Sequence, residues 1–395
     1  MTSQLYPGLR TEPHEVSTGG KGSRAMRILQ VTPRFLPYSG GVESHVYQVA
    51  SRLSREGHQV TILTTDTTGQ LATREDMDGF TIRRVPAWPP ERDLYWAPRL
   101  TNVIRQEPWD VVHVQSYHTF VAPLAMWAAA RARRPYVVTF HGGGHSSTLR
   151  NAIRGSQVRL LKPLLARASR IVAVAAFEID LYGRRLGIPS SRFRLIPNGC
   201  DLPAGRAPAG MSAPTDEHLI LSIGRLERYK GHHRILQAMP HIVERDPSAR
   251  LRIVGAGPFE ATLRRLTDQL GLNDRVTIGA IAPTEREAMA RLISRAALVV
   301  LLSEYETHPI AVLEALSCGR PCVVADTSGM RELAERGLAR AVAVNSKPDQ
   351  IAQAVIETLA RPQLVSPIAL PTWDDCSHGL EALYQEVLAE AACAS

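Results

Sequence analysis

The chain has 395 residues, 44% of them hydrophobic and 21% charged, which is typical of a globular protein of roughly two domains. No apolar run approaches the ~20 residues that a membrane-spanning helix needs, and the five cysteines form no CxxC pair, so we expect reduced thiols in the cytoplasm and no zinc site. The net charge of +8 is concentrated in residues 1–201, where 26 Lys and Arg stand against 15 Asp and Glu; this favours an anionic partner other than nucleic acid, since RNP, zinc-finger and helix-turn-helix patterns are missing.

The pattern of the chain predicts two domains of one type. Residues 1–25 lack the apolar core of a signal peptide and are expected to form a disordered tail. In residues 26–201 short β-branched runs such as "RILQVTP" alternate with amphipathic stretches, which indicates βαβ units and a mainly parallel sheet. Pro, Ala and Gly dominate residues 202–217, the expected linker; the alternation restarts in residues 218–372, and a helix is predicted for residues 373–395. The predicted fold class is therefore α/β, with two Rossmann-like βαβ domains facing a central cleft.

Glycines follow two predicted strands of the first domain. Gly40 and Gly41 lie between a strand and a helix, where bare backbone can approach a phosphate at the helix N-terminus. His141 stands at the carboxyl end of the fifth strand, before three glycines, in a loop expected to face the cleft. A simple turn is the alternative for the glycine pair, and a structural histidine is the alternative for His141.

The second domain opens with two cations between glycines. In "GRLERYKG" Gly224 follows a strand, and Arg225 and Lys230 flank the loop that leads into a helix. One guanidinium and one ammonium at a helix N-terminus suit a diphosphate, with surface charge as the alternative. Gly255 follows another strand in "IVGAGP", but the missing third glycine and the proline that follows argue against a dinucleotide fingerprint.

The stretch "ETHPIAVLE" holds two carboxylates, Glu306 and Glu314. Pro309 suits the first turn of a helix, which puts Glu306 in the preceding loop and Glu314 about a turn and a half into the helix. The two side chains are thus staggered along one wall, and the backbone near His308, Pro309 and Ile310 opens toward the cleft, although proline has no N–H. This predicts two grips on different parts of a polyhydroxylated ligand; two solvated helix charges are the alternative.

Two further segments have competing interpretations. Asp76 and Asp78 show the D-x-D spacing of some metal–nucleotide sites, but they lie away from the predicted strand ends, and a polar turn is expected there. The segment from Arg150 to Arg170 is basic and partly amphipathic. It is a candidate for peripheral contact with an anionic membrane, with a solvated basic helix face as the alternative.

In combination these motifs resemble those of the retaining glycosyltransferases of family 4, which have the GT-B fold. The Gly-Gly loop, "TFHG", "IPNGCD", "GRLERYKG", "IVGAGP" and "ETHPIAVLE" occur in the family's order, and the resemblance extends from Arg27 to the C-terminal helix. It implies a nucleotide-diphosphate sugar in the cleft, with the first domain on the acceptor side. It also implies that the final helix, which Trp373 begins, crosses back toward the first domain, and that Asn198 and Asp201 are mostly structural.

The resemblance implies a role for each candidate residue. Glu306 matches the residue that contacts donor-sugar hydroxyls, Glu314 the residue that holds the ribose, and His141 the active-site histidine that contacts the donor sugar. Thr307 and His308 depart from the family's commonest residues and border the sugar pocket, so they leave the identity of the sugar open.

The same resemblance implies how the reaction proceeds without a cofactor. Arg225 and Lys230 match the basic pair that binds the diphosphate, which Gly40 and Gly41 would approach. Departure of a nucleoside diphosphate leaves negative charge on the phosphate, and two cations stabilise that charge where it develops. No divalent metal is therefore expected, and the family's reaction is usually drawn as front-face attack with retention.

Other functions remain open at this level. A nucleotide-sugar epimerase or a glycogen-synthase-like polymerase has the same fold, and a nicotinamide-dependent oxidoreductase also has two Rossmann domains, although the chain lacks its G-x-G-x-x-G motif. An inactive sugar-nucleotide binding module is a further alternative. The acceptor is undetermined among glycolipids, polysaccharides and small metabolites.

Overall fold

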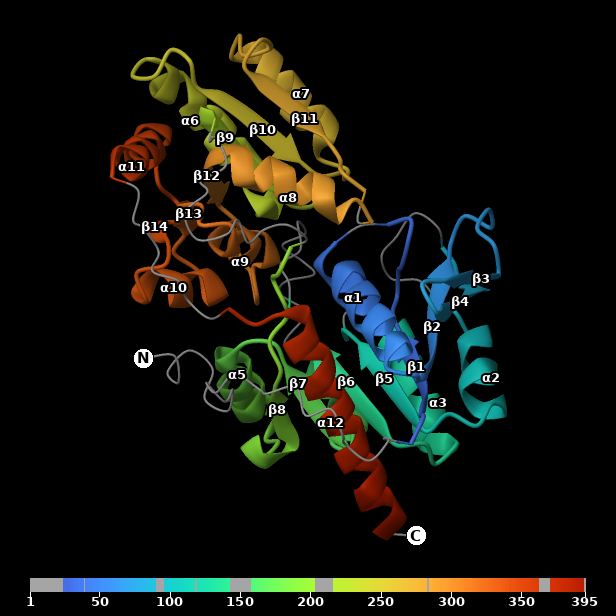
Figure 1. Ribbon diagram of the computed structural model, residues 1–395. Helices are drawn as coiled ribbons and strands as arrows, with labels where there is room; N and C mark the ends of the chain where they lie inside the picture. The colour runs from blue at the N-terminus through green and yellow to red at the C-terminus, as the bar shows by residue number, and fades with distance from the viewer. Residues whose placement is uncertain are drawn as a thin grey trace.

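The protein consists of two α/β units, each built on its own sheet (Figure 1). The computed structural model describes residues 24–38, 40–89, 96–117, 119–142, 158–202, 216–282, 284–361 and 370–393. Most of the expected N-terminal tail, residues 1–23, lies outside these ranges. The predicted α/β class with two Rossmann-like sheets facing each other is confirmed.

The first sheet has the strand order β3-β4-β2-β1-β5-β6-β7-β8, and all neighbours are parallel except β3, which is antiparallel to β4. The order reverses at β1, so a crevice is expected at the carboxyl ends of β1 and β5. The strands are β1 (Arg27–Val31), β2 (Gln59–Asp66), β3 (Arg74–Met77), β4 (Phe80–Pro86), β5 (Val111–Gln115), β6 (Tyr136–Phe140), β7 (Arg170–Ala173) and β8 (Phe193–Leu195). The helical elements are α1 (Gly41–Arg55), α2 (Arg99–Gln106), α3 (Val121–Arg131), α5 (Ala176–Leu186) and the 3₁₀ turn η2 (Ser190–Arg192).

The second sheet has the order β11-β10-β9-β12-β13-β14, and every neighbouring pair is parallel. Its order reverses at β9, beside β12. The strands are β9 (Asp216–Ile223), β10 (Arg250–Val254), β11 (Val276–Gly279), β12 (Ala296–Leu301), β13 (Cys322–Ala325) and β14 (Arg340–Val342). The helical elements are η3 (Arg228–Lys230), α6 (His232–Val243), α7 (Glu260–Gln269), α8 (Arg286–Arg295), α9 (Ile310–Ser317), α10 (Ser328–Glu335) and α11 (Pro348–Ala360).

The strands are apolar at successive positions because helices cover both faces of each sheet. Ile28 and Leu29 are adjacent in β1, and they enter different core clusters, one on each face of the first sheet. Val299 and Val300 divide in the same way between the two clusters of the second sheet. Successive side chains of a strand point to opposite faces, and both faces are buried here, so the strands appear in the sequence as uninterrupted β-branched runs.

The last helix, α12 (Trp373–Cys393), leaves the second unit and packs on the first sheet beside α1 (Figure 1). Its Trp373, Leu380 and Tyr384 are almost fully buried in the same cluster as Ile28 and Val46. The C-terminal end of the chain thus completes the core that the N-terminal end begins.

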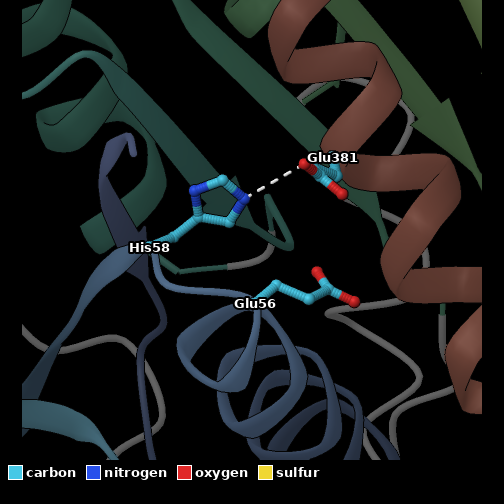
Figure 2. A group of neighbouring side chains, drawn as sticks. All are labelled: Glu56, His58 and Glu381. Carbon is cyan, nitrogen blue, oxygen red and sulfur yellow. Dashed lines mark ion pairs between the residues drawn. The ribbon is translucent and has the colours of Figure 1, made fainter. Parts of the chain in front are cut away.

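A polar group fastens the middle of α12 to the start of β2 (Figure 2). Nε2 of the buried His58 lies 3.2 Å from a carboxylate oxygen of Glu381, and the ligand atoms of Glu56, His58 and Glu381 all lie within 4.8 Å of one another. Nδ1 of His58 accepts the backbone N–H of Met26 at 3.2 Å, so the ring carries its proton on Nε2. A metal would need a lone pair on that nitrogen, and we therefore interpret the group as a fastening of α12.

Two details differ from the sequence-based expectations. Asp76 does not lie in a turn: it belongs to the edge strand β3, which is only four residues long, and the turn comes at Asp78 with φ 46°. The expected linker also ends earlier than predicted, because Asp216 is already the first residue of β9 and pairs with Ala296 of β12. The other residues of that linker, 203–215, lie outside the described ranges.

The basic segment from Arg150 to Arg170 is described only from residue 158 onward. Residues 158–165 are helical, with Val158 and Leu165 buried and Leu160 81% exposed. Among the described helices, none combines the length and the apolarity that crossing a bilayer requires.

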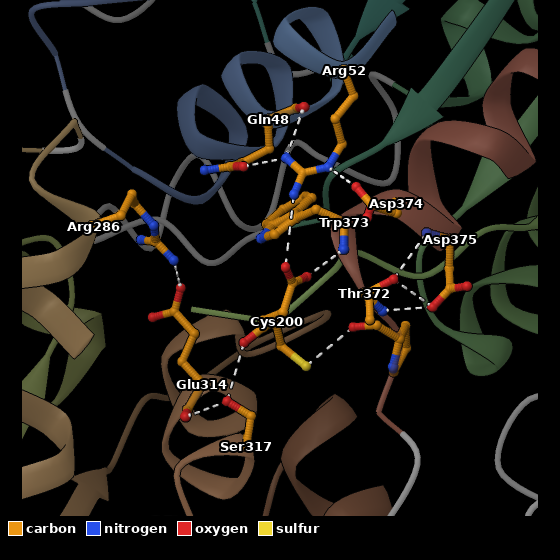
Figure 3. A network of polar contacts seen from close by, with 12 residues as sticks. Gln48, Arg52, Cys200, Arg286, Glu314, Ser317, Thr372, Trp373, Asp374 and Asp375 are labelled. Carbon is orange, nitrogen blue, oxygen red and sulfur yellow. Dashed lines mark hydrogen bonds and ion pairs between the residues drawn. The ribbon is translucent and has the colours of Figure 1, made fainter. Parts of the chain in front are cut away.

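The chain passes between the two units twice, and the two passages lie side by side (Figure 3). Cys200 is bound through both its backbone N–H (3.0 Å) and its thiol (3.2 Å) to the carbonyl oxygen of Pro371. The backbone N–H of Trp373 donates to Asp201, and Arg52 of α1 binds Asp374 at 2.5 Å. The "IPNGCD" stretch thus has structural contacts at the junction of the units.

We predict that Gly199→Ala destabilises the protein, because a Cβ at this position would overlap the backbone of Trp373. Overpacking of this kind should lower the free energy of unfolding by about 1–3 kcal/mol in urea denaturation. Gly279→Ala is the matched control, since a Cβ there meets nothing within 4 Å. Equal stability of the two variants would show that the passages can separate without cost.

Candidate active site

The candidate residues follow the carboxyl ends of strands in both sheets, and their loops meet between the units. The hydroxyl of Thr307, after β12, donates to the carbonyl oxygen of Gly142, after β6. Ile310, at the start of α9, packs against the apolar cluster of the first sheet. The strand-end rule for parallel sheets therefore holds for both units at once.

The glycine pair before α1 lies against the second unit. A Cβ added to Gly40 would lie 3.4 Å from Cδ of Arg225, and one added to Gly41 would lie 3.9 Å from Cδ1 of Ile310. The φ of Gly40 is 177°, which any residue can adopt, and the atom nearest to an added Cβ is Oε2 of Glu43 on α1, at 2.5 Å. The N-terminus of α1 and the guanidinium-bearing side chain of Arg225 thus border the same space.

Lys230 and Glu306 form an ion pair in the cleft. Nζ of Lys230 lies 2.5 Å from Oε1 of Glu306, which also accepts the hydroxyl of Ser303 at 2.8 Å. Burial disfavours the charged amine, but the carboxylate of Glu306 outweighs burial, and the pKa of Lys230 is raised above its usual value. The ammonium is therefore charged at neutral pH, and Glu306 holds it in place.

Gly224 and Gly255 pack the loops after β9 and β10 against each other. Both have φ 157°, and a Cβ on Gly255 would overlap the carbonyl oxygen of Gly224. The structure therefore brings these two predicted residues together: packing requires glycine at position 255, and the positive φ favours glycine at position 224.

Glu314 lies in α9, apart from the Lys230–Glu306 pair, and binds Arg286 (Figure 3). Burial raises the pKa of Glu314, while the guanidinium of Arg286 opposes that shift. The two glutamates are thus staggered and have separate cationic partners. Pro309 is the residue before α9, a shift of one position from the prediction: its ψ of 81° is not helical, although its carbonyl oxygen accepts the first helical hydrogen bond, from the N–H of Leu313 at 3.1 Å.

Arg286 was not identified from the sequence, although the strand-end rule could have indicated it. It begins α8 after β11, and its Nε is buried without a hydrogen-bond partner among the described residues. A buried donor without a partner next to Glu314 suits a polar ligand.

His141 lies between two polar side chains of the first unit. Its Nε2 is 2.7 Å from Oε1 of Gln115 at the end of β5, and its ring centroid is 4.8 Å from that of His45. Nδ1 of His45 binds Oδ1 of Asn198 at 2.8 Å. Burial lowers the pKa of His45 to about 4, although the bond to Asn198 opposes the shift, so a neutral imidazole packs against His141.

Thr307 and His308 lie between β12 and α9, where the second unit contacts the first. Thr307 is only 4% exposed and reaches Gly142 across the cleft. Burial, with His45 as a smaller cause, lowers the pKa of His308 to about 3. A neutral imidazole therefore stands beside the Glu306 loop.

Glu178 is a second residue that the sequence analysis missed. It lies in the first turn of α5, after β7, and is fully buried. Burial raises its pKa to about 8, against the opposing effect of the backbone N–H groups of Val174, Ala175 and Gly142. Gly142, next to His141, is thus held by Glu178 within the first unit and by Thr307 from the second.

His232, the first residue of α6, makes a hydrogen bond to the loop that carries Arg225. Its Nδ1 binds the hydroxyl of Ser222 at 2.8 Å, and its Nε2 donates to the carbonyl oxygen of Arg225 at 3.2 Å. Burial lowers its pKa to about 4, although the bond to Arg225 opposes the shift.

Comparison with known families matches both units. The family described as Glycosyltransferase Family 4 matches residues 39–203, and the family described as Glycosyl transferases group 1 matches residues 207–367. The division between the two matches falls where residues 203–215 join the sheets.

Curated relatives and solved structures agree with these matches. The chain is 30% identical over 344 residues to the GDP-mannose:cellobiosyl-diphosphopolyprenol alpha-mannosyltransferase of Xanthomonas campestris, with 85% of this chain and 87% of that protein covered. It is 26% identical to D-inositol 3-phosphate glycosyltransferase 1 of Catenulispora acidiphila, covering 94% and 98%. Sucrose-phosphate synthase from Thermosynechococcus elongatus has the same fold, with a TM-score of 0.72 at 22% identity and coverage of 92% and 100%. HepE from Anabaena in complex with UDP and glucose has a TM-score of 0.70 at 18% identity, covering 91% and 99%.

We predict that His232→Gln makes the protein less sensitive to acid. The folded pKa of about 4 lies below the ordinary 6.5, so the unfolded chain binds more protons between these values and wild-type stability falls as the pH drops from 6.5 toward 4. Between pH 7.5 and 4.5 the variant should lose about 2 kcal/mol less unfolding free energy than wild type in urea denaturation. His241→Gln, at an exposed histidine, should keep the wild-type loss. An unchanged loss in His232→Gln would contradict the buried neutral state.

Proposed function

Because the chain belongs to glycosyltransferase family 4 and is a glycosyltransferase, we propose that its cleft binds the diphosphate of a nucleotide sugar between Arg225, Lys230 and the Gly40–Gly41 loop. One observation carries this proposal: Arg225 and Lys230 both lie in the segment between β9 and α6, and Arg225 lies beside the backbone of Gly40 before α1. A helix N-terminus with glycines favours an anion, and two nearby cations add to that preference.

The ion pair of Lys230 with Glu306 indicates how the donor enters. In the ligand-free arrangement Lys230 neutralises Glu306 at 2.5 Å. A diphosphate would compete for the ammonium and release the carboxylate oxygens of Glu306 to accept hydroxyl groups of the donor sugar. Glu314 is proposed to accept the ribose hydroxyls in the same way, in exchange with Arg286.

The reaction transfers the sugar by breaking its bond to the diphosphate oxygen. The electron pair of that bond stays on the leaving diphosphate, where Arg225 and Lys230 stabilise it. We propose that these cations replace a divalent metal, that His141 contacts the donor sugar, and that the anomeric configuration is retained. The leaving phosphate would take the proton of the acceptor hydroxyl.

GDP-mannose is the first donor to consider. Two Xanthomonas relatives at 29–30% identity carry GDP-mannose in their names, and HepE was solved with UDP and glucose. Thr307 and His308 border the proposed sugar pocket, so we expect them to select the hexose.

The acceptor is proposed to carry phosphate. The names of the relatives include a diphosphopolyprenol and an inositol phosphate, and the first unit has the excess of positive charge. Both kinds of acceptor are anionic, and only the polyprenol would bring the enzyme to a membrane.

A membrane contact is proposed for the exposed face of residues 158–165. Leu160 is 81% exposed there, between the exposed cations Arg159 and Lys162. An apolar side chain among cations suits the interface of an anionic bilayer.

The proposed function predicts that one nucleotide-diphosphate sugar stabilises the protein in EDTA. A donor at about 100 times its dissociation constant should add about 2.7 kcal/mol, which is measurable as a rise of the melting temperature. The panel should contain GDP-, UDP- and ADP-sugars together with NAD(P). A rise only with NAD(P), or only after Mg²⁺ or Mn²⁺ is added, would contradict the metal-free donor site.

Two alanine variants of one turn sharpen this experiment. Lys230→Ala should abolish the rise and lower kcat about 100-fold, because a charge-stabilising donor is lost. Arg228→Ala removes an exposed cation of the same 3₁₀ turn and should behave as wild type. Equal effects of the two substitutions would indicate general electrostatic attraction and not a specific site.

The membrane proposal predicts salt-sensitive binding to vesicles with anionic lipids. Arg159→Glu should weaken that binding, since it reverses a charge beside Leu160. Arg331→Glu reverses an exposed charge on α10 and serves as the matched control. Equal sedimentation with neutral and anionic vesicles would contradict the proposal.

A further inference from the structure

Fully buried polar side chains form a row between the first sheet and α12. Gln30 on β1, His113 and Gln115 on β5, Thr139 on β6 and Tyr384 on α12 are each at most 1% exposed. Burying polar groups costs free energy unless they find partners, so a continuous row of them in an apolar core requires an explanation.

The row is a continuous chain of hydrogen bonds that ends at His141. From His141 it runs through Gln115 (2.7 Å) and Gln30 (2.6 Å) to the hydroxyl of Tyr384 (3.0 Å). From Tyr384 it continues to His113 (2.6 Å) and on to the hydroxyl of Thr139 (2.6 Å). The C-terminal helix therefore reaches the candidate active site through two glutamine side chains.

The bonds have one direction. Nε2 of Gln115 donates to Oε1 of Gln30, so the atom of Gln115 that faces His141 is its carbonyl oxygen, which can only accept. Nε2 of His141 must then carry the proton, and in a neutral ring Nδ1 has the lone pair.

The same argument gives the donors and acceptors at the Thr139 end of the hydrogen-bond chain. Nε2 of Gln30 donates to the oxygen of Tyr384, so the phenol proton goes to Nδ1 of His113. His113 then carries its own proton on Nε2 and donates it to the hydroxyl of Thr139. Gln115, Gln30, Tyr384 and His113 each accept one bond and donate one, so all the bonds run in the same direction from His141 to Thr139.

We propose that Gln115, Gln30 and Tyr384 are positioning residues that hold the ring of His141 with its proton on Nε2. The imidazole that meets the donor sugar then has one fixed orientation and one fixed tautomer. The inference rests on the proposed contact of His141 with the donor sugar, and it adds the tautomer and the residues that set it.

Tyr384 and His113 carry no charge at neutral pH. Burial raises the pKa of the Tyr384 hydroxyl, with the bond from Gln30 opposing that shift, and burial together with His45 lowers the pKa of His113. Tyr384 therefore acts on His141 through the orientation of dipoles and not through ionisation.

Nitrogen NMR of histidine-labelled protein tests the tautomer directly and without activity. We expect His141, assigned by the loss of its signals in His141→Gln, to show a protonated Nε2 and an unprotonated Nδ1. In Tyr384→Phe the Nε2 group of Gln30 loses its acceptor, and the two His141 resonances should move toward each other as both tautomers become populated. A proton on Nδ1 in wild type, or unchanged resonances in Tyr384→Phe, would overturn the proposal.

Kinetics provide the second test, with a matched loss of a buried hydroxyl. Tyr384→Phe should lower kcat/KM about tenfold, the effect of one hydrogen bond. Tyr136→Phe removes the hydroxyl of another, less deeply buried tyrosine, which donates to the carbonyl oxygen of Leu164, and should leave kcat/KM unchanged. A similar loss in both variants would indicate a structural effect alone and overturn the proposal.

Gln115→Met is a second variant if Tyr384→Phe does not fold. It removes the partner of His141 while keeping the side-chain length, and the same tenfold loss is expected. If Tyr384→Phe does fold, the double variant Gln115→Met, Tyr384→Phe should have the same kcat/KM as either single variant, because the hydrogen-bond chain is already broken. Strictly additive losses of kcat/KM would contradict a shared hydrogen-bond chain. Full activity of His141→Ala would refute the proposed sugar contact, whereas an inactive His141→Ala with the wrong tautomer in wild type would refute the positioning chain alone.

Discussion

Parallel strands carry all their carboxyl ends to one edge of a sheet, and in this protein the edges of two sheets face the same space. This constraint places the Gly40–Gly41 loop, His141, Lys230 and Glu306 within one cleft, although they are far apart in the sequence. The hydrogen bond of Thr307 to Gly142 shows how closely the two edges approach.

Within that space, each cation forms an ion pair with a carboxylate. Lys230 binds Glu306, Arg286 binds Glu314, and Arg225 binds Glu227 at 2.9 Å. Buried charges without partners would be expensive, so each of these cations lies beside a carboxylate. Under the proposed function, a diphosphate would compete with these carboxylates for the cations, and sugar hydroxyls would compete for the carboxylates.

Local patterns predicted most of the fold and part of the site. The β-branched runs and the stretch "ETHPIAVLE" carry their information within a few residues, so the strands and the staggered glutamates could be read directly. Arg286 and Gln115 could not be identified so easily, because their importance comes from neighbours on other strands: Glu314 for one, His141 for the other. Strand β3 was missed since three charged residues followed by one methionine have no apolar alternation to detect.

The C-terminal helix contributes to the junction of the units, to the core of the first sheet and to the surroundings of His141. Trp373 closes the junction at Asp201, the middle of α12 fills the core of the first sheet, and Tyr384 reaches toward His141 through the buried glutamines. A helix that served only for stability would not need a hydroxyl at position 384, because phenylalanine would fill the same volume without the cost of burying a polar group. The retained hydroxyl is explained if the helix also orients the groups that meet the donor, so that an active site forms only when the whole chain has folded.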